Sequence, residues 1–101
     1  MRIFGVDPGT ARVGWAVIET ENAKIKTLSY GCIETEKTLS PQLRLLAIHA
    51  RLLTLIAKYQ PEVLSLEDLF FATNAKTAIS VGQARGVILL VAAQQKVPVV
   101  S

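Results

Sequence analysis

Arg2-Ile3-Phe4-Gly5-Val6-Asp7 is the stretch of this 101-residue chain from which the fold can be worked out. Its apolar residues are followed by a single acid, Asp7, and then by Pro8-Gly9. This pattern predicts a short strand that ends at a turn. A second stretch, Val63-Leu64-Ser65-Leu66-Glu67, has the same pattern, because a mostly apolar run is again followed by an acid, Glu67. We expect both stretches to be buried strands.

The sequence around these two stretches predicts three further strands and two helices. The predicted strands cover residues 2–7, 13–19, 24–35, 63–67 and 97–100, and the predicted helices cover residues 40–59 and 74–95. Asn22-Ala23 is expected to form the tip of a hairpin. Ser40 as N-cap, with Pro41 in the first turn, marks the start of the first helix, and Pro61 marks its end.

This order, β-β-β-α-β-α-β, restricts the topology of the predicted α/β fold. Short connections make the first three strands antiparallel neighbours, whereas a helical crossover makes the following strand parallel. The prediction is therefore a mixed five-stranded sheet with strand order 3-2-1-4-5. Ligands of open α/β sheets bind at the carboxyl ends of strands beside a switch in strand order, and Asp7 and Glu67 stand at those ends.

The right-handed crossover rule places both helices on one face of this sheet. Both faces nevertheless look apolar, because Ile3 and Gly5 alternate with Phe4 and Val6 along the first strand. A sheet that is buried on both sides needs two covering layers, and this sequence supplies one. Either a partner covers the second face or the chain lacks a C-terminal portion. We favour the second explanation and expect residues 1–101 to be a single domain truncated after its fifth strand, with the covering C-terminal helices absent.

The composition is that of one globular domain, since 50% of the residues are hydrophobic, 19% are charged and the formal net charge is +3. The excess positive charge lies in residues 69–101, which contain three basic residues and no acid. A basic end suggests an anionic partner, although on charge alone an ordinary solvated surface is the favoured explanation. The single cysteine, Cys32, and the lack of a signal-peptide pattern or a long apolar run predict a cytoplasmic protein without a membrane partner.

Asp7 and Glu67 are the candidate catalytic and metal-binding residues. Two carboxylates on adjacent parallel strands repel each other unless a cation lies with them or one is protonated. A divalent ion such as Mg²⁺ prefers oxygen ligands, and paired ions about 4 Å apart stabilise both oxygens of a phosphodiester displacement. Each acid alone has a structural explanation, because Asp-Pro-Gly is ordinary turn chemistry and a strand-end Glu67 faces solvent. Their joint position favours a function.

The residues after the second acid suggest contacts with nucleic acid. Phe70-Phe71 either closes the core or stacks on a base at the rim of the site. Thr73 and Asn74 either cap the second helix, which is the favoured interpretation, or touch phosphate. The candidate DNA-binding residues are Phe70, Phe71, Thr73, Asn74, Lys76, Gln83 and Arg85.

Gly82 and Gly86 form, with Ala78, a stripe of small residues along the second helix. A glycine inside a helix lowers its stability by about 1 kcal/mol relative to alanine, so the pair needs an explanation. The stripe either packs closely on the sheet or forms the interface of a homodimer. Trp15, Cys32 and His49 are expected to be structural.

Three blocks of this sequence together resemble the RuvC-type Holliday-junction resolvases, which are RNase H-like endonucleases. The blocks are Phe4-Gly5-Val6-Asp7-Pro8-Gly9-Thr10 with Val13-Gly14-Trp15, Leu66-Glu67-Asp68-Leu69-Phe70-Phe71 with Asn74, and Gly82-Gln83-Ala84-Arg85-Gly86. The resemblance implies an RNase H-like fold, with Asp7 and Glu67 as metal-binding catalytic carboxylates. It also implies that Phe70 stacks on a base near the junction centre and that the second helix lies in a dimer interface.

The resemblance further implies partners and a cofactor. Members of the family act as homodimers on four-way DNA in recombination and repair, and they use Mg²⁺, for which Mn²⁺ is a substitute. A branch-migration helicase is a further expected partner. Because the family completes its site with acids on a helix beyond the fifth strand, we expect a crossover junction endodeoxyribonuclease that is weakly active or inactive as residues 1–101.

Two alternatives stay open. The chain is compatible with a non-catalytic module that binds DNA junctions or dimerises. It is also compatible with a phosphotransfer enzyme of RNase H-like or actin-like type, because Asp7-Pro8-Gly9-Thr10 through Gly14 resembles the phosphate loop of actin-like kinases. A kinase of that type would need a second, similar domain.

Overall fold

The computed structural model of the chain describes residues 1–9, 12–67 and 75–101. The elements are β1 (Arg2–Pro8), β2 (Arg12–Glu21), β3 (Lys24–Glu34), α1 (Pro41–Tyr59), β4 (Val63–Leu66), α2 (Ala75–Gln94) and β5 (Val99–Val100). The predicted order of strands and helices is therefore confirmed, and the bounds differ from the predicted ones by at most two residues.

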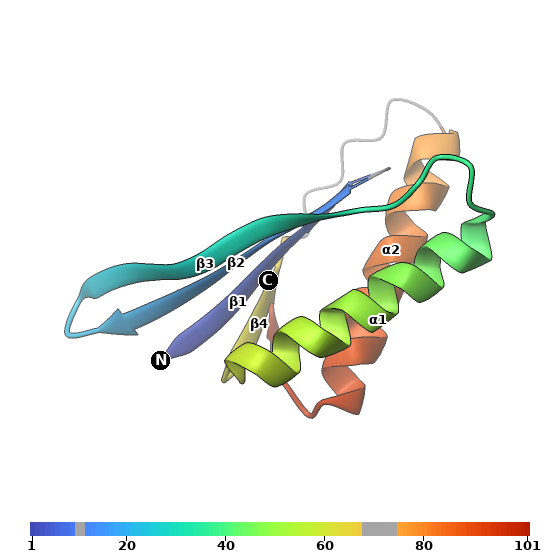
Figure 1. Ribbon diagram of the computed structural model, residues 1–101. Coiled ribbons are helices and arrows are strands. Elements are labelled where there is room, and N and C mark those ends of the chain that lie inside the picture. The colour runs from blue at the N-terminus through green and yellow to red at the C-terminus, as the bar shows by residue number, and fades with distance from the viewer. Residues whose placement is uncertain (10–11, 68–74) are drawn as a thin grey trace.

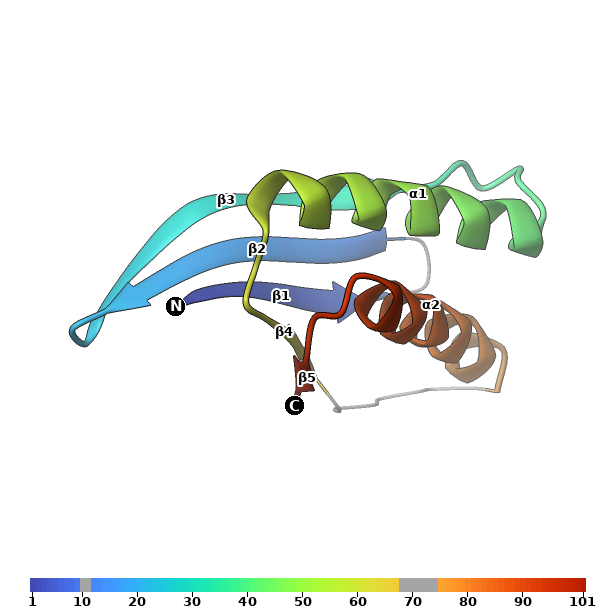
Figure 2. The same cartoon turned by 90° about the horizontal axis from the view of Figure 1, so that it is seen from below.

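The five strands form one mixed sheet in the order β3-β2-β1-β4-β5 (Figures 1 and 2). The pairs β1–β2 and β2–β3 are antiparallel, and the pairs β1–β4 and β4–β5 are parallel. This is the predicted topology: the crossover through α1 places β4 beside β1, and the crossover through α2 places β5 beside β4, both parallel to β1.

Both helices lie on one face of the sheet (Figures 1 and 2). The core lies between this face and the helices, and its fully buried side chains include Phe4, Val17, Leu64, Leu66, Leu52, Ile88 and Val91. On the opposite face the alternation of the strands places Gly5 beside Ala16 on one neighbour and Ser65 on the other. No described helix covers this opposite face, which we call the open face.

The hairpin of β2 and β3 extends past the end of β1 as a two-stranded ribbon (Figure 1). Its tip is at Asn22 and Ala23, as predicted, and both residues have the left-handed backbone that a tight hairpin turn needs, with φ of 51° and 63°. Oppositely charged residues face each other across the strands, Glu21 with Lys24 and Glu19 with Lys26. Such cross-strand pairs favour this register.

Helix α1 begins at the predicted N-cap, Ser40, but the serine hydroxyl makes no capping hydrogen bond. Ser40 Oγ is buried and has no partner among the described residues. The helix start is therefore set by Pro41, whose fixed φ suits the first helical position. At the other end, Gln60 adopts the left-handed conformation, and its backbone N–H donates to the Ile56 carbonyl oxygen at 2.8 Å.

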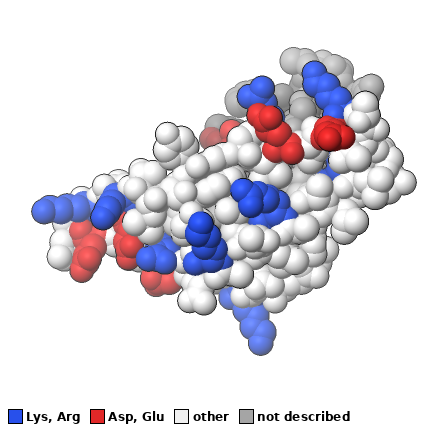
Figure 3. Space-filling view, in the orientation of Figure 1, with Lys and Arg blue, Asp and Glu red and all other residues white. Residues whose placement is uncertain are grey.

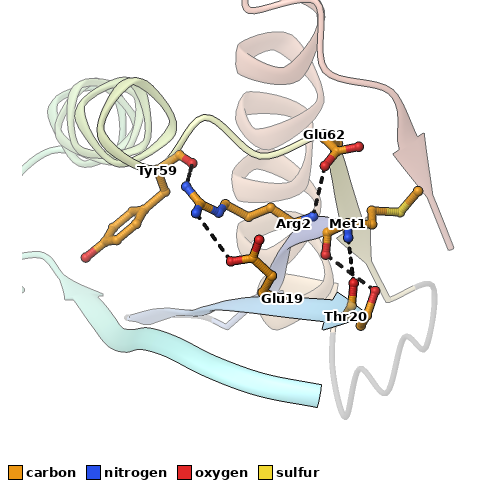
Figure 4. Close-up of polar contacts among 6 residues, drawn as sticks. All are labelled: Met1, Arg2, Glu19, Thr20, Tyr59 and Glu62. Carbon is orange, nitrogen blue, oxygen red and sulfur yellow. Dashed lines mark hydrogen bonds and ion pairs between the residues drawn. The ribbon is translucent and has the colours of Figure 1, made fainter. Parts of the chain in front are cut away.

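Hydrogen bonds of Met1 and Arg2 hold the N-terminus of β1 against two neighbouring elements, α1 and β2 (Figure 4). Arg2 Nη1 donates to the carbonyl oxygen of Tyr59 at the end of α1, at 2.7 Å, and Nη2 donates to Glu19 Oε2 on β2 at 3.3 Å. The amino group of Met1 donates to the Thr20 carbonyl oxygen at 2.6 Å. These bonds fix the register of β1 with β2 and hold β1 against the end of α1. Asp7 lies at the other end of β1.

Candidate active site

Asp7 and Glu67 lie next to each other at the carboxyl ends of β1 and β4. The parallel ladder pairs Gly5 with Ser65 and Val6 with Leu66, and the two acids are the next residues in the same register. Because side chains alternate across a strand, both carboxylates project from the open face. Both residues are exposed, so a substrate can reach them.

The two acids line one hollow of about 610 Å³ on the sheet. Small residues surround them there, since Gly5, Gly14 and Ser65 also line it. Without long side chains at these positions, the backbone of the sheet is accessible and the hollow can take a bulky polar group beside the carboxylates. Ser101 lies at the same hollow, which places the end of β5 at the site as well.

The turn after Asp7 depends on Gly9. Its backbone N–H donates to the carbonyl oxygen of Arg12 at 2.7 Å. A Cβ at residue 9 would lie 2.9 Å from that same oxygen, which is closer than real Cβ contacts. The glycine therefore permits the close approach that ends β1 directly after the first acid, whereas Thr10 falls outside the described residues.

The end of β4 is held by a residue of α2. Arg85 Nη1 donates a hydrogen bond to the backbone oxygen of Glu67 at 3.0 Å. The sequence suggested a DNA contact for Arg85, which stays a prediction. Its bond to the strand end was not foreseen, because no local pattern relates residues that lie 18 positions apart.

The donor chemistry of the site fits a hard divalent cation. Mg²⁺ is usually bound through one or two carboxylates and keeps several waters, and the carboxylates of Asp7 and Glu67 are such oxygen donors. Among the described residues, no group of three or more His, Cys, Asp and Glu side chains could hold a metal. The two carboxylates are thus the protein ligands that this part of the chain offers.

Most of the predicted DNA-binding residues fall outside the described part. These are Phe70, Phe71, Thr73 and Asn74, together with the side chain of Lys76. Gln83 is described and exposed, and it lines a second hollow of about 260 Å³ between the N-terminal parts of α1 and α2 and the turn after β1.

Arg12 and Arg44, for which the sequence predicted no site role, also line this second hollow. Arg44 Nε donates to Thr35 Oγ1 at 3.0 Å, and Arg12 lies 3.8 Å from Glu34 in an exposed ion pair. The tertiary fold alone brings these two arginines to one hollow. On the face shown in Figure 3 the basic side chains are scattered, and they are interleaved with acids at the hairpin end.

The small-residue stripe of α2 does not pack on the sheet. Gly82 and Gly86 are exposed, and a Cβ added to either would meet nothing within 4 Å. Ala78 is half-buried. Exposed apolar side chains lie along the same helix, among them Ile79 at 61% and Leu90 at 52% exposure. The packing explanation of the two glycines is therefore wrong, and the helix–helix explanation remains.

Helix α2 contains an 18-residue window, Thr77–Gln94, that is long and apolar enough to cross a membrane by length and composition, with a mean hydropathy of 1.3. Helices that are buried in the core of a protein can have the same length and hydropathy. Here Ala84, Ile88 and Val91 are buried, so α2 serves as such a core helix along one side.

Trp15 and His49 have structural contacts, as expected. Trp15 stacks on Phe4 with ring centroids 5.9 Å apart and is tilted against Tyr59 at 6.1 Å. His49 Nε2 lies 2.9 Å from Gln94 Oε1, which joins α1 to α2. Cys32 is a free, exposed thiol on β3.

Comparison with known proteins gives a consistent result along the whole chain. The family model described as crossover junction endodeoxyribonuclease RuvC matches residues 3–101. A protein of that name from Moorella thermoacetica is 48% identical over 99 residues, and one from Caldicellulosiruptor saccharolyticus is 44% identical over 100 residues; each match covers 98% of this chain.

A solved structure of T. thermophilus RuvC in complex with a Holliday junction substrate has a TM-score of 0.91 to this chain at 32% identity. The similarity covers 98% of this chain and 63% of that one. The chain also spans about 60% of the length of the curated relatives, namely 59% of the Moorella protein and 60% of the Caldicellulosiruptor protein.

Proposed function

Because the chain belongs to the family of the crossover junction endodeoxyribonuclease RuvC, we propose that it forms the carboxylate half of the active site of a structure-selective DNA endonuclease. The substrate is a four-way junction, and the reaction is hydrolysis of a phosphodiester bond. One observation carries the proposal: Asp7 and Glu67 extend the register of neighbouring parallel strands and line one hollow on the open face.

The proposed chemistry starts from the repulsion between these two carboxylates. Two negative groups at neighbouring positions are stabilised by a shared cation, and Asp7 and Glu67 would hold Mg²⁺, with Mn²⁺ as a substitute. Such an ion, when bound, stabilises the negative charge that develops on phosphodiester oxygens. Gly5, Gly14 and Ser65 leave the space in which the DNA backbone approaches the carboxylates.

The variant Asp7→Asn tests this proposal. The chain is fused to the C-terminal part of the Moorella thermoacetica relative, and wild type and variant are incubated with labelled four-way DNA and Mg²⁺. The variant should cleave ~10³-fold more slowly, since loss of a metal ligand removes several kcal/mol of transition-state stabilisation and each tenfold corresponds to about 1.4 kcal/mol. Junction affinity measured without divalent ions should stay within about threefold, because other residues contact the phosphates.

The main alternative, a non-catalytic junction-binding module, gives a different result in the same assay. Such a module binds four-way DNA, but neither the wild type nor Asp7→Asn cleaves it. Glu67→Gln provides a second variant of the same kind, since it also removes a charge while keeping size and hydrogen-bonding atoms. Cleavage that is unaffected by both substitutions would reject the carboxylate site.

We also propose that two copies of the chain associate through α2. The exposed stripe over Gly82 and Gly86 permits close approach of two helix backbones, and Arg85 is the only charged residue between positions 77 and 94. A stripe that is apolar and made of small residues is complementary to itself, as a twofold symmetric contact requires. A dimer would present two carboxylate sites to one four-way junction.

A further inference from the structure

We propose that Arg85 is a positioning residue for Glu67: its hydrogen bond to the Glu67 carbonyl oxygen fixes the end of β4 and thereby the direction of the carboxylate. This inference rests on the proposed function of Asp7 and Glu67 as a metal site. It assigns to Arg85 a role inside the protein in place of the DNA contact that the sequence suggested.

The position of Glu67 is what makes an anchor necessary. The ladder between β1 and β4 ends with the pair Val6–Leu66, and the ladder between β4 and β5 ends with Ser65–Val100. Glu67 therefore stands one residue beyond the last ladder pair and is exposed. The bond of 3.0 Å from Arg85 Nη1 joins its backbone to α2.

Helix α2 is well suited to provide this anchor because its own place in the fold is fixed. Ala84 and Ile88, which flank Arg85 along the helix, are 2% and 0% exposed. Arg85 itself is half-buried and is the single charged residue of the segment 77–94. A charged side chain in an otherwise apolar helix is explained by a specific polar contact, and the Glu67 carbonyl oxygen is such a contact.

The chemistry of the guanidinium group agrees with this role. A hydrogen bond from a charged donor is stronger than one between neutral groups, and the planar group holds its donors in a fixed orientation. Restraining the Glu67 backbone restricts the positions of the Glu67 carboxylate relative to Asp7. Groups that orient metal ligands in this way typically change metal affinity by about 10- to 100-fold when they are removed.

The test compares Arg85→Met and Arg85→Lys with the wild-type chain. Mn²⁺ is titrated while the NMR signals of Asp7 and Glu67 are followed, since the paramagnetic ion broadens signals near its site. Arg85→Met should bind Mn²⁺ about 10- to 100-fold more weakly. Arg85→Lys should recover part of the affinity because its ammonium group also donates hydrogen bonds. Arg51→Met, which removes an exposed guanidinium from α1, should bind as the wild type does.

Two further measurements separate positioning from other roles. Without metal, the carbonyl carbon of Glu67 should change its chemical shift in Arg85→Met and not in Arg51→Met. The affinity for four-way DNA in the absence of divalent ions should stay within about threefold of the wild type in Arg85→Met, whereas a phosphate contact would weaken it together with its salt dependence.

The outcomes are distinct. Equal Mn²⁺ affinity in the wild type and Arg85→Met, or loss of DNA affinity without loss of metal affinity, would overturn the role of Arg85 and leave the proposed function intact. A wild-type chain whose Asp7 and Glu67 signals do not respond to Mn²⁺ would overturn both. If Arg85→Met does not fold, Arg85→Ala decides, because alanine has no side-chain donor: wild-type Mn²⁺ affinity in Arg85→Ala with an unshifted Glu67 carbonyl carbon would reject the role of the bond.

Discussion

Gly31 lies opposite Trp15 in the ladder of β2 and β3, and it leaves room for the indole ring. A Cβ at residue 31 would lie 2.9 Å from Cζ2 of Trp15. The ring cannot readily move away, because it stacks on Phe4 and meets Tyr59. We expect Gly31→Ala to lower the free energy of unfolding by about 1–3 kcal/mol, the usual effect of overpacking. Chemical denaturation followed by the fluorescence of Trp15, the single tryptophan, measures this change.

Gly5→Ala is the matched control for this prediction. The nearest atom to a Cβ at residue 5 is the Ala16 carbonyl oxygen at 3.8 Å, which is an ordinary contact. Since alanine loses less conformational entropy on folding than glycine, this variant should be as stable as the wild type or slightly more stable. Similar losses of stability in both variants would show that the contact with Trp15 is not the cause.

Tyr59 has a pKa below its ordinary value of 10.0, mainly because it is hydrogen-bonded to Ser29 and also because Lys58 and Arg51 are nearby, while desolvation acts in the opposite direction. Ser29→Ala should therefore raise the pKa of Tyr59 toward the ordinary value. Ultraviolet absorbance of the phenolate measures it in a Tyr30→Phe background, where Tyr59 is the sole tyrosine.

The same titration has a consequence for stability with a definite sign. A lowered pKa in the folded state means that the ionised tyrosine favours folding. The contribution is present above pH 10.0 and is lost as the pH falls through the lowered pKa of the folded state. Ser29→Ala should thus reduce stability more at alkaline than at neutral pH. An equal reduction at both would contradict the assignment of the shift to Ser29.

At the scale of the elements, α2 has one face in the core and one that the chain itself does not cover. Gly82→Ala should raise the stability of the monomer by about 1 kcal/mol, because alanine is the better helix former and the added methyl group meets nothing. The same methyl group should weaken self-association about 5- to 140-fold, since overpacking costs about 1–3 kcal/mol and about 1.4 kcal/mol corresponds to tenfold. Denaturation at low protein concentration and analytical ultracentrifugation measure the two effects.

Ala50→Gly on α1 is the control for the dimer prediction. It makes the reverse exchange at an exposed helical position, so it should lower stability and leave self-association unchanged. If Gly82→Ala leaves self-association unchanged, the stripe on α2 is not the dimer interface.

The elements themselves were predictable because their signals are local. The alternation of apolar residues, the turn at Asn22-Ala23 and the proline at position 61 are read within a few positions, and the crossover rules then convert element order into strand order. The same reasoning placed Asp7 and Glu67 at one edge of the sheet, and the register of β1 and β4 agrees with it.

What the sequence did not predict are relations between distant residues. Ser40 occupies the N-cap position, but its side chain makes no capping hydrogen bond. The local sequence predicts the position of the serine but not the surroundings of its hydroxyl group. Arg85 donates to the Glu67 carbonyl oxygen, and Arg12 and Arg44 line one hollow, only because tertiary packing brings them together. Whether Gly82 and Gly86 face inward or outward depends on the rotation of α2, which its nearly uniform apolar sequence leaves open.

At the scale of the whole molecule, the sheet separates two functions. The face under α1 and α2 holds the buried core, with Phe4, Leu64 and Leu66 fully buried. The open face holds the carboxylates and the small residues around them. Along β1 and β4, Phe4, Val6, Leu64 and Leu66 are thus buried in the core, whereas Gly5, Asp7 and Ser65, which alternate with them, line the hollow on the open face.

This division predicts how a polypeptide of these 101 residues behaves with four-way DNA. The described residues contain no group of three or more acidic, His or Cys side chains that could hold a metal, and phosphodiester displacement between two metal ions needs more oxygen ligands than Asp7 and Glu67 supply. We expect junction binding but little or no cleavage over a wide range of Mg²⁺ concentrations. When the chain is continued by the C-terminal part of the Moorella thermoacetica relative, cleavage should appear and should depend on Asp7.

The measurement is the amount of nicked four-way DNA per mole of protein, with T. thermophilus RuvC as the positive control. If the joined part supplies further oxygen donors beside Asp7 and Glu67, as the resemblance implies, the gain should appear in the cleavage rate, while junction affinity changes less. Cleavage by the 101 residues alone at the rate of the positive control would contradict this prediction. In that case Asp7 and Glu67 would have to assemble a complete metal site with groups on the DNA itself.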